Sequence, residues 1–117
     1  MSLSEMPSID LKPHDWLIVR AILERLVPHC TVWAFGSRAT WTAKAFSDLD
    51  LVVVTDQPLE WATSTALAEA FDESDLPIKV DVVDWAKTSE SFRKIIQKDK
   101  VVVQEKIKGA AVSAGPQ

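Results

Sequence analysis

This chain of 117 residues has one cysteine, three glycines, no tyrosine and no long apolar run. Cys30 alone allows neither an internal disulfide nor a thiolate metal site, and such cysteine usage fits a reducing cytosol. The densest apolar stretch, residues 51–54, has the length of a strand and falls far short of the ~20 residues that a membrane span needs. The first residues lack a basic segment that leads into an apolar one, so we expect no secretory signal and a cytoplasmic protein.

An excess of positive charge is also absent, because 13 Lys and Arg stand against 17 Asp and Glu, for a net charge of −4. Phosphate contacts need a basic face, so we do not expect direct nucleic-acid binding. An acidic balance is compatible with a carboxylate-rich metal site. The length allows one hydrophobic core. We therefore expect one domain over residues 1–108 and a disordered tail over residues 109–117, which has little apolar mass to pack.

Apolar periodicity and helix-breaking residues predict an alternation of helices and strands, which is typical of an α/β protein. Three consecutive valines at 52–54 predict burial on both faces, as in a central strand of a layered sheet. Trp16 and Trp33 fall in core patterns, whereas Trp41 is the tryptophan most expected to be exposed. The expected helices cover residues 13–27, residues 56–72 and a segment capped by Thr88 or Ser89, and the expected strands cover residues 31–35, 48–55, 78–83 and 101–107.

Two aspartates lie near the start of the second expected strand. Asp48 and Asp50 are two residues apart, so both side chains of a strand would point to the same face, about 6 to 7 Å apart. Two carboxylates on an otherwise apolar strand are costly unless a cation lies between them. Hard oxygen donors at this spacing suit magnesium. The alternative is that Asp48 is a turn residue and Asp50 a surface charge at the strand edge.

A third aspartate, Asp81, interrupts the apolar run of the third expected strand, as Asp50 does in the second, so we expect a buried carboxylate on each of these strands. If these strands are neighbours, Asp48, Asp50 and Asp81 form a cluster that binds two magnesium ions for phosphoryl or nucleotidyl transfer. Asp84 has the opposite parity along its strand, so we interpret it as a strand-end or helix-cap residue.

A glycine-serine pair ends the first expected strand. Gly36 permits a tight turn and a close backbone approach, and Ser37 offers an N–H and a hydroxyl to a phosphate, although such pairs also mark ordinary turns. Arg38 is a candidate phosphate ligand or a solvated arginine. Ser47 either orients the carboxylates by a hydrogen bond or caps a turn.

The pattern of G-S-R-A at 36–39, S-D-L-D-L at 47–51 and V-D-V at 80–82 resembles the minimal nucleotidyltransferases of the DNA polymerase β superfamily. The resemblance runs from the first helix to the last valine-rich strand. It implies an α/β (α+β) fold with a mixed sheet of about four strands flanked by helices. The chain is especially similar to short bacterial members that are encoded beside a HEPN-domain partner.

In that family the glycine-serine pair grips the nucleotide triphosphate, and three aspartates bind magnesium. The third aspartate also helps to activate the acceptor hydroxyl. The resemblance therefore places nucleotide binding on Gly36 and Ser37, with Arg38 and Ser47 nearby, and metal binding and catalysis on Asp48, Asp50 and Asp81. Many relatives have glycine where this chain has Trp41, whose indole would narrow the nucleotide site, stack on a base or face a partner.

The resemblance implies magnesium-dependent transfer of AMP from ATP to a hydroxyl of a partner protein, here a HEPN-type toxin that the chain would neutralise as an antitoxin. A binding module that masks its partner sterically, with or without nucleotide, is the alternative. Modification of a small drug is disfavoured because 117 residues leave no room for a second, drug-binding domain.

Overall fold

The computed structural model describes residues 6–106, and the segment 109–117 that we expect to be a disordered tail lies outside them. The elements in chain order are α1 (Pro13–Leu26), β1 (Thr31–Phe35), α2 (Ser37–Thr40), β2 (Leu49–Val54), α3 (Trp61–Asp72), β3 (Val80–Asp84), the short 3-10 helix η2 (Trp85–Lys87), α4 (Glu90–Asp99) and β4 (Val101–Gln104). None of the helices within residues 6–106 combines the length and the apolar character needed to cross a membrane.

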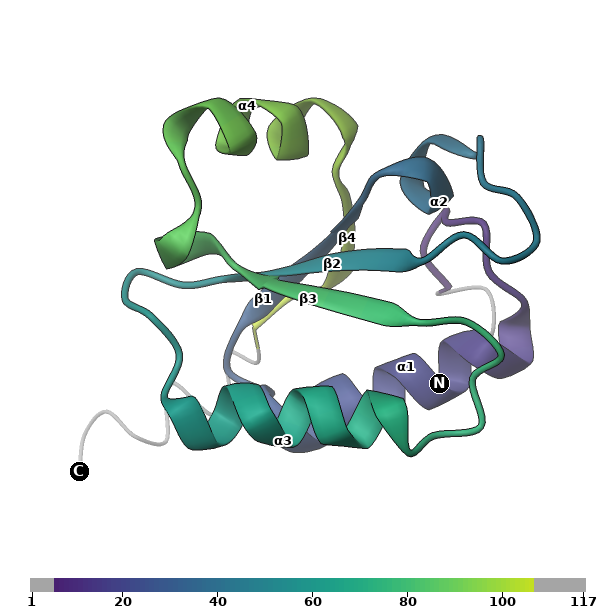
Figure 1. The fold of residues 1–117 in the computed structure, drawn as a ribbon, viewed down its shortest axis with the longest axis horizontal. Helices are drawn as coiled ribbons and strands as arrows, with labels where there is room; N and C mark the ends of the chain where they lie inside the picture. The colour runs from purple at the N-terminus through teal and green to yellow at the C-terminus, as the bar shows by residue number, and fades with distance from the viewer. Residues whose placement is uncertain (1–5, 107–117) are drawn as a thin grey trace.

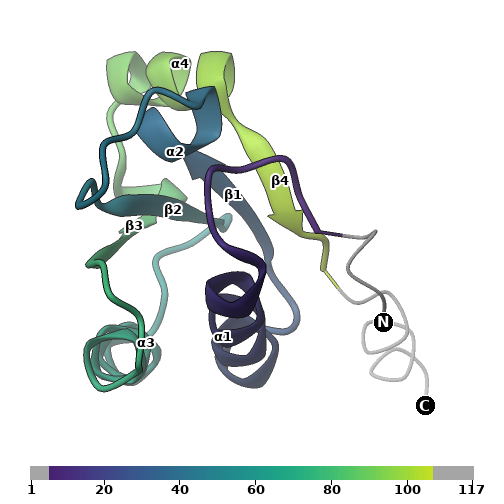
Figure 2. The same ribbon diagram turned by 90° about the vertical axis from the view of Figure 1, so that its right-hand side faces the viewer.

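Four strands form one mixed sheet in the order β3-β2-β1-β4. The pairing of β1 with β2 and of β1 with β4 is antiparallel, whereas β2 and β3 are parallel. The helices α1 and α3 cover one face of the sheet, and α2 and α4 lie on the other (Figures 1 and 2). This confirms the α/β fold with about four strands, and β2 is central, as its consecutive valines predict.

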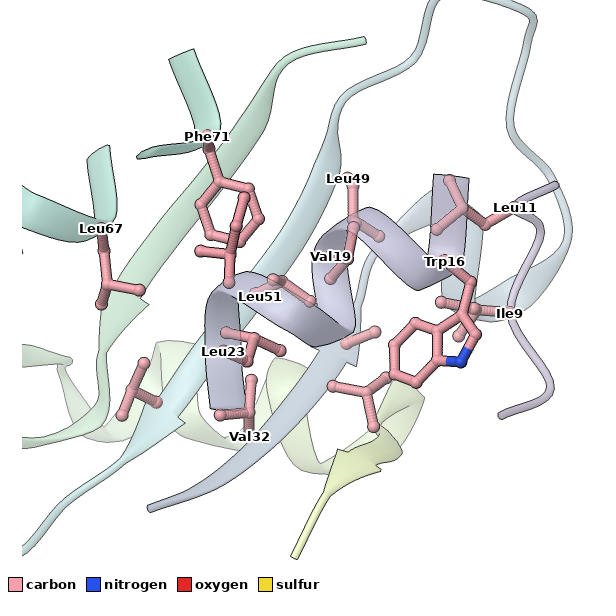
Figure 3. Packing of buried hydrophobic residues seen from close by; sticks show 14 of the residues in the cluster. Ile9, Leu11, Trp16, Val19, Leu23, Val32, Leu49, Leu51, Leu67 and Phe71 are labelled. Carbon is pink, nitrogen blue, oxygen red and sulfur yellow. The ribbon is translucent and has the colours of Figure 1, made fainter. Parts of the chain in front are cut away.

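The main core lies between the sheet and the pair α1 and α3. Helix α1 begins at a proline in its first turn and buries one apolar stripe, which includes Trp16, Val19 and Leu23. They belong to one cluster with Leu49 and Leu51 of β2, and Figure 3 shows Val19 and Leu23 near these leucines and Trp16 beside Ile9. A smaller cluster on the opposite face holds α4 against the sheet through its buried residues Phe35, Val52 and Ile96. The sheet is therefore anchored on both faces.

Several element boundaries differ from those expected. Helix α3 begins at Trp61 rather than near the proline at 58, because the carboxylate of Asp84 accepts hydrogen bonds from the Thr55 hydroxyl and the Leu59 backbone N–H and holds this segment extended. The last strand ends at Gln104, short of the predicted residue 107. Strand β3 begins at Val80, two residues later than predicted.

Local caps agree better with the sequence. The Ser89 hydroxyl accepts a hydrogen bond from the Phe92 N–H at 3.1 Å, so Ser89 rather than Thr88 caps α4. Asp84 caps η2 by accepting from the Ala86 N–H, as its parity predicts. Trp16 is buried and Trp41 is exposed, as expected. The exposed fraction of Trp61, 82 %, is nevertheless larger than the 58 % of Trp41, so Trp41 is not the most exposed tryptophan.

Candidate functional site

Two of the predicted carboxylates lie side by side in the sheet. Strands β2 and β3 are parallel neighbours, and Asp50 is the direct ladder partner of Asp81. Asp48 lies just before β2, two residues from Asp50, and it is exposed. The structure therefore confirms that the strands are neighbours, which was the condition for a cluster of three carboxylates. It also places Asp48 outside the strand in which it was expected.

The cluster lies on the face that carries α2 and α4. Leu49 and Leu51, on either side of Asp50, pack into the core beneath the sheet, and successive side chains of a strand alternate between its faces. Val80 and Val82 pack against the same core, so Asp81 points to the opposite face as well. Both carboxylates therefore project away from α1 and α3, toward the side on which α2 lies (Figure 2).

The three carboxylates differ in their environments. Burial raises the pKa of Asp50, and the negative charges of Asp81 and then Asp48 raise it further. Asp81 itself is exposed, so the expectation that it is a buried carboxylate is wrong. The reason is topological, because β3 is at the edge of the sheet and β2 is not. Asp50 is thus the carboxylate whose charge is most costly without a cation.

Gly36 packs directly against Asp50. A Cβ atom at Gly36 would lie 2.5 Å from Oδ2 of Asp50, and its φ of +75° is a conformation that residues with a side chain rarely adopt. Glycine is therefore required here by both backbone conformation and space. This contact brings the start of α2, with Ser37 as its first residue, to the carboxylates.

Arg38 is only 7 % exposed, so the alternative of a solvated arginine is wrong. Its guanidinium donates hydrogen bonds to the carbonyl oxygens of Asp10 (2.7 Å), Ser47 (3.0 Å), Ala45 (3.2 Å) and Lys44 (3.4 Å). These bonds tie the loop between α2 and β2 to the N-terminal segment. Arg38 thereby fixes the backbone that leads into Asp48.

Ser47 lies in this loop, and its hydroxyl accepts a hydrogen bond from the Lys44 N–H at 2.9 Å. Of its two predicted roles, the turn cap is the one that the geometry shows. The neighbouring Phe46 is 86 % exposed, and the sequence did not single it out. Trp41 adopts a left-handed conformation with φ of 62°, and its indole N–H donates to the carbonyl oxygen of Ser8 at 3.3 Å. The loop between α2 and β2 thus carries two exposed aromatic side chains.

The carboxylates of the site offer the type of oxygen donor that a hard metal ion takes, but not a formed metal site. Within residues 6–106, no three Asp, Glu, His or Cys side chains lie close enough together to form a group that could hold a metal ion. The oxygen donors of Asp48, Asp50 and Asp81 are nonetheless of the hard type that magnesium takes, typically one or two carboxylates at a time with water and phosphate oxygens. The repulsion that raises the pKa of Asp50 is of the kind that a bound cation would offset.

Comparisons with known proteins agree with this geometry. The model of the family described as "Polymerase beta, Nucleotidyltransferase" matches residues 19–108. A relative from Haemophilus influenzae, named "Probable protein adenylyltransferase MntA", is 51 % identical over 106 residues, which are 91 % of this chain and 93 % of the relative.

Two solved structures have a similar fold. One, described as the crystal structure of a toxin-antitoxin with AMP-PNP, has a TM-score of 0.65 at 20 % identity and covers 83 % of this chain and 78 % of its own. The other, a tri-AMPylated Shewanella oneidensis HEPN toxin in complex with its MNT antitoxin, has a TM-score of 0.56 at 18 % identity and covers 87 % and 79 %. At these identities the likeness shows the fold alone.

Proposed function

Because this chain belongs to the polymerase beta nucleotidyltransferase family, we propose that it transfers AMP from ATP to a hydroxyl of a partner protein and releases pyrophosphate. The observation that carries the proposal is the pairing of Asp50 with Asp81 beside Gly36. The name of the Haemophilus influenzae relative supports a protein as the acceptor. The toxin–antitoxin complexes that share the fold support a HEPN-domain toxin as that partner, with this chain as its antitoxin. We place this pair in the cytoplasm.

In this proposal Asp48, Asp50 and Asp81 would hold one or two magnesium ions. Magnesium, when bound, offsets the charge of the phosphates and of the leaving pyrophosphate. The carboxylate of Asp81 accepts the proton of the acceptor hydroxyl, whose oxygen then bonds to the α-phosphorus of ATP. The bond from that phosphorus to the bridging oxygen breaks, and pyrophosphate leaves with its electrons. The exposure of Asp81 supports its role at the acceptor side.

Gly36, Ser37 and Ser47 would contact the nucleotide, because they lie on the two segments that meet at Asp50 and Asp48. Arg38 is better suited to position these segments than to touch a phosphate, since four backbone carbonyl groups already accept hydrogen bonds from its guanidinium. The chain would therefore supply rate mainly by orientation and charge neutralisation.

The proposal is tested with the double variant Asp48→Asn and Asp50→Asn. We expect wild-type protein with labelled ATP and magnesium to label the HEPN-domain protein encoded beside it, and the variant to lose labelling by at least about a hundredfold. The matched control is Asp56→Asn with Asp75→Asn, which removes the same charge from two exposed positions outside the site. The unfolding temperature of each variant must be at least that of the wild type, so that a loss of labelling does not reflect a loss of fold.

Neutralisation of the toxin in cells separates catalysis from masking. Loss of neutralisation by the double variant, with the complex intact, supports transfer. Neutralisation that persists in the double variant would show that the chain acts by steric masking. Absence of label on any protein with the wild-type chain would contradict the proposal.

A further inference from the structure

The outer edge of β3 offers backbone hydrogen-bonding groups to a further strand. Strand β3 ends the sheet, with β2 on its inner side. The Leu49 N–H donates to the Lys79 carbonyl at 2.9 Å, which fixes the alternation along the strand. In a parallel pair, the backbone groups of Lys79, Asp81 and Val83 then point toward β2, and those of Val80 and Val82 point outward. An extended segment can pair with this edge.

A groove of about 590 Å³ lies beneath the same edge, between β3 and α3. Figure 1 shows α3 running along β3 on this side of the molecule. Large apolar side chains line much of the groove, and Ala68 of α3 contributes only a small side chain to the helical wall. These apolar residues include Leu67, Phe71, Leu76, Ile78, Val80 and Val82. The groove therefore suits the alternate side chains of an added strand.

The charges around the groove are mostly negative. Glu69 and Asp72 from α3 are exposed, and the cation in the lining is Lys79. Asp81 also belongs to the lining, but its carboxylate projects to the opposite face of the sheet. Asp84 also lines the groove, but its carboxylate already accepts three hydrogen bonds. The remaining carboxylates favour an occupant with basic side chains.

The groove and the carboxylate cluster lie on opposite faces of the same edge. A strand added beside β3 would lie about 4.8 Å away, and its side chains would alternate between the two faces. Those on one face would enter the groove. Those on the other would stand beside Asp81, at the cross-strand distance of about 5 Å. One docking mode would thus anchor a segment and present a hydroxyl to the cluster.

We propose that the acceptor is an extended, basic polypeptide segment that adds to β3 as a fifth strand, with its hydroxyl-bearing residue beside Asp81. This inference rests on the proposed transfer of AMP to a protein hydroxyl and names how that acceptor is recognised. Main-chain pairing supplies affinity in such strand addition, and the pocket for alternate side chains supplies selectivity.

Peptide binding is measured with the Asp48→Asn, Asp50→Asn double variant, which we expect not to transfer AMP. Docking is therefore observed apart from catalysis. The probe is a library of fluorescent nine-residue peptides in which valine alternates with serine, threonine or tyrosine and both ends carry lysine. A second library carries glutamate at both ends.

Two pairs of variants test the edge and the groove. Val82→Pro removes an outward N–H without breaking the pairing with β2, and Val82→Thr keeps that N–H as a control. Glu69→Lys with Asp72→Lys reverses the groove charge, and Glu60→Lys with Glu73→Lys matches that change at positions outside the groove lining.

We expect lysine-ended peptides to bind and glutamate-ended ones to bind at least tenfold more weakly. Val82→Pro and the groove charge reversal should each weaken binding of the lysine-ended peptides at least tenfold, and the two controls should stay within twofold. Equal binding by Val82→Pro, or no binding by any peptide, would overturn the inference. A dimer that Val82→Pro dissociates would also overturn it, because a second copy would then occupy the edge. Bound peptides that the wild-type chain leaves unlabelled with ATP and magnesium would instead contradict the proposed transfer while the docking mode stands.

Discussion

At the scale of single residues, Gly36 carries the tightest steric constraint at the site. Gly36→Ala would place a Cβ atom 2.5 Å from the Asp50 carboxylate in a backbone conformation that alanine rarely adopts. We expect the free energy of unfolding, measured in urea, to fall by about 2 kcal/mol or more. In an Asp50→Ala background the same substitution should cost less, since the colliding oxygen is gone and only backbone strain remains. Equal costs in both backgrounds would show that the contact with Asp50 contributes nothing.

A second prediction at this scale concerns Asp50, whose pKa is raised in the folded protein. A carboxylate whose pKa is higher in the folded state destabilises the fold when ionised. That cost is absent below the usual value of 3.8, grows as pH rises through it, and is complete above the raised value. We therefore expect Asp50→Asn to raise the unfolding temperature at pH 7.5 in EDTA, and the gain to shrink toward pH 4. Asp56→Asn is the control, and a gain that does not depend on pH would contradict this assignment.

At the scale of elements, the loop between α2 and β2 depends on Arg38. Lysine cannot satisfy the same set of carbonyl groups with one ammonium, so Arg38→Lys should lower the free energy of unfolding by about 2 to 4 kcal/mol. It should also raise the KM for ATP, because the loop carries Ser47 and leads into Asp48. Arg20→Lys, at an exposed ion pair with Glu24, is the control and should change stability by less than about 0.5 kcal/mol. A wild-type KM with Arg38→Lys would show that the loop keeps its geometry without these bonds.

The elements themselves were largely predictable, because periodicity and caps are local signals. The apolar stripe of α1, the valines of β2 and the cap at Ser89 all lie where the sequence indicates. The start of α3 was not predictable, since it depends on hydrogen bonds that the carboxylate of Asp84, more than twenty residues away, accepts from Thr55 and Leu59. The role of Arg38 was missed for the same reason, because two of its partners, Asp10 and Ser47, are distant in sequence.

At the scale of the whole molecule, strand order decides what the candidate site looks like. The spacing of the aspartates predicts a cluster, but only the parallel pairing of β2 with β3 brings Asp50 and Asp81 together. The edge position of β3 makes Asp81 exposed where its apolar neighbours indicated burial. The apolar residues around Asp81 do not indicate that β3 is at the edge of the sheet. Because β3 is an edge strand, an acceptor can lie along its outer side, where we place it.

The charge of the whole molecule gives a prediction about salt. With a net charge of −4 and an acidic groove, the chain should attract a basic acceptor through long-range forces that salt screens. Raising NaCl from 50 to 500 mM should therefore increase the KM for a lysine-ended acceptor peptide several-fold, in labelling assays with saturating ATP and magnesium. ATP is itself an anion, so its own KM should not increase in parallel. The Glu69→Lys, Asp72→Lys variant should lose most of this dependence, whereas Glu60→Lys with Glu73→Lys, at equal net charge, should keep more of it. A KM that does not change with NaCl, or an equal loss of salt dependence in both variants, would show that the groove carboxylates do not select the acceptor.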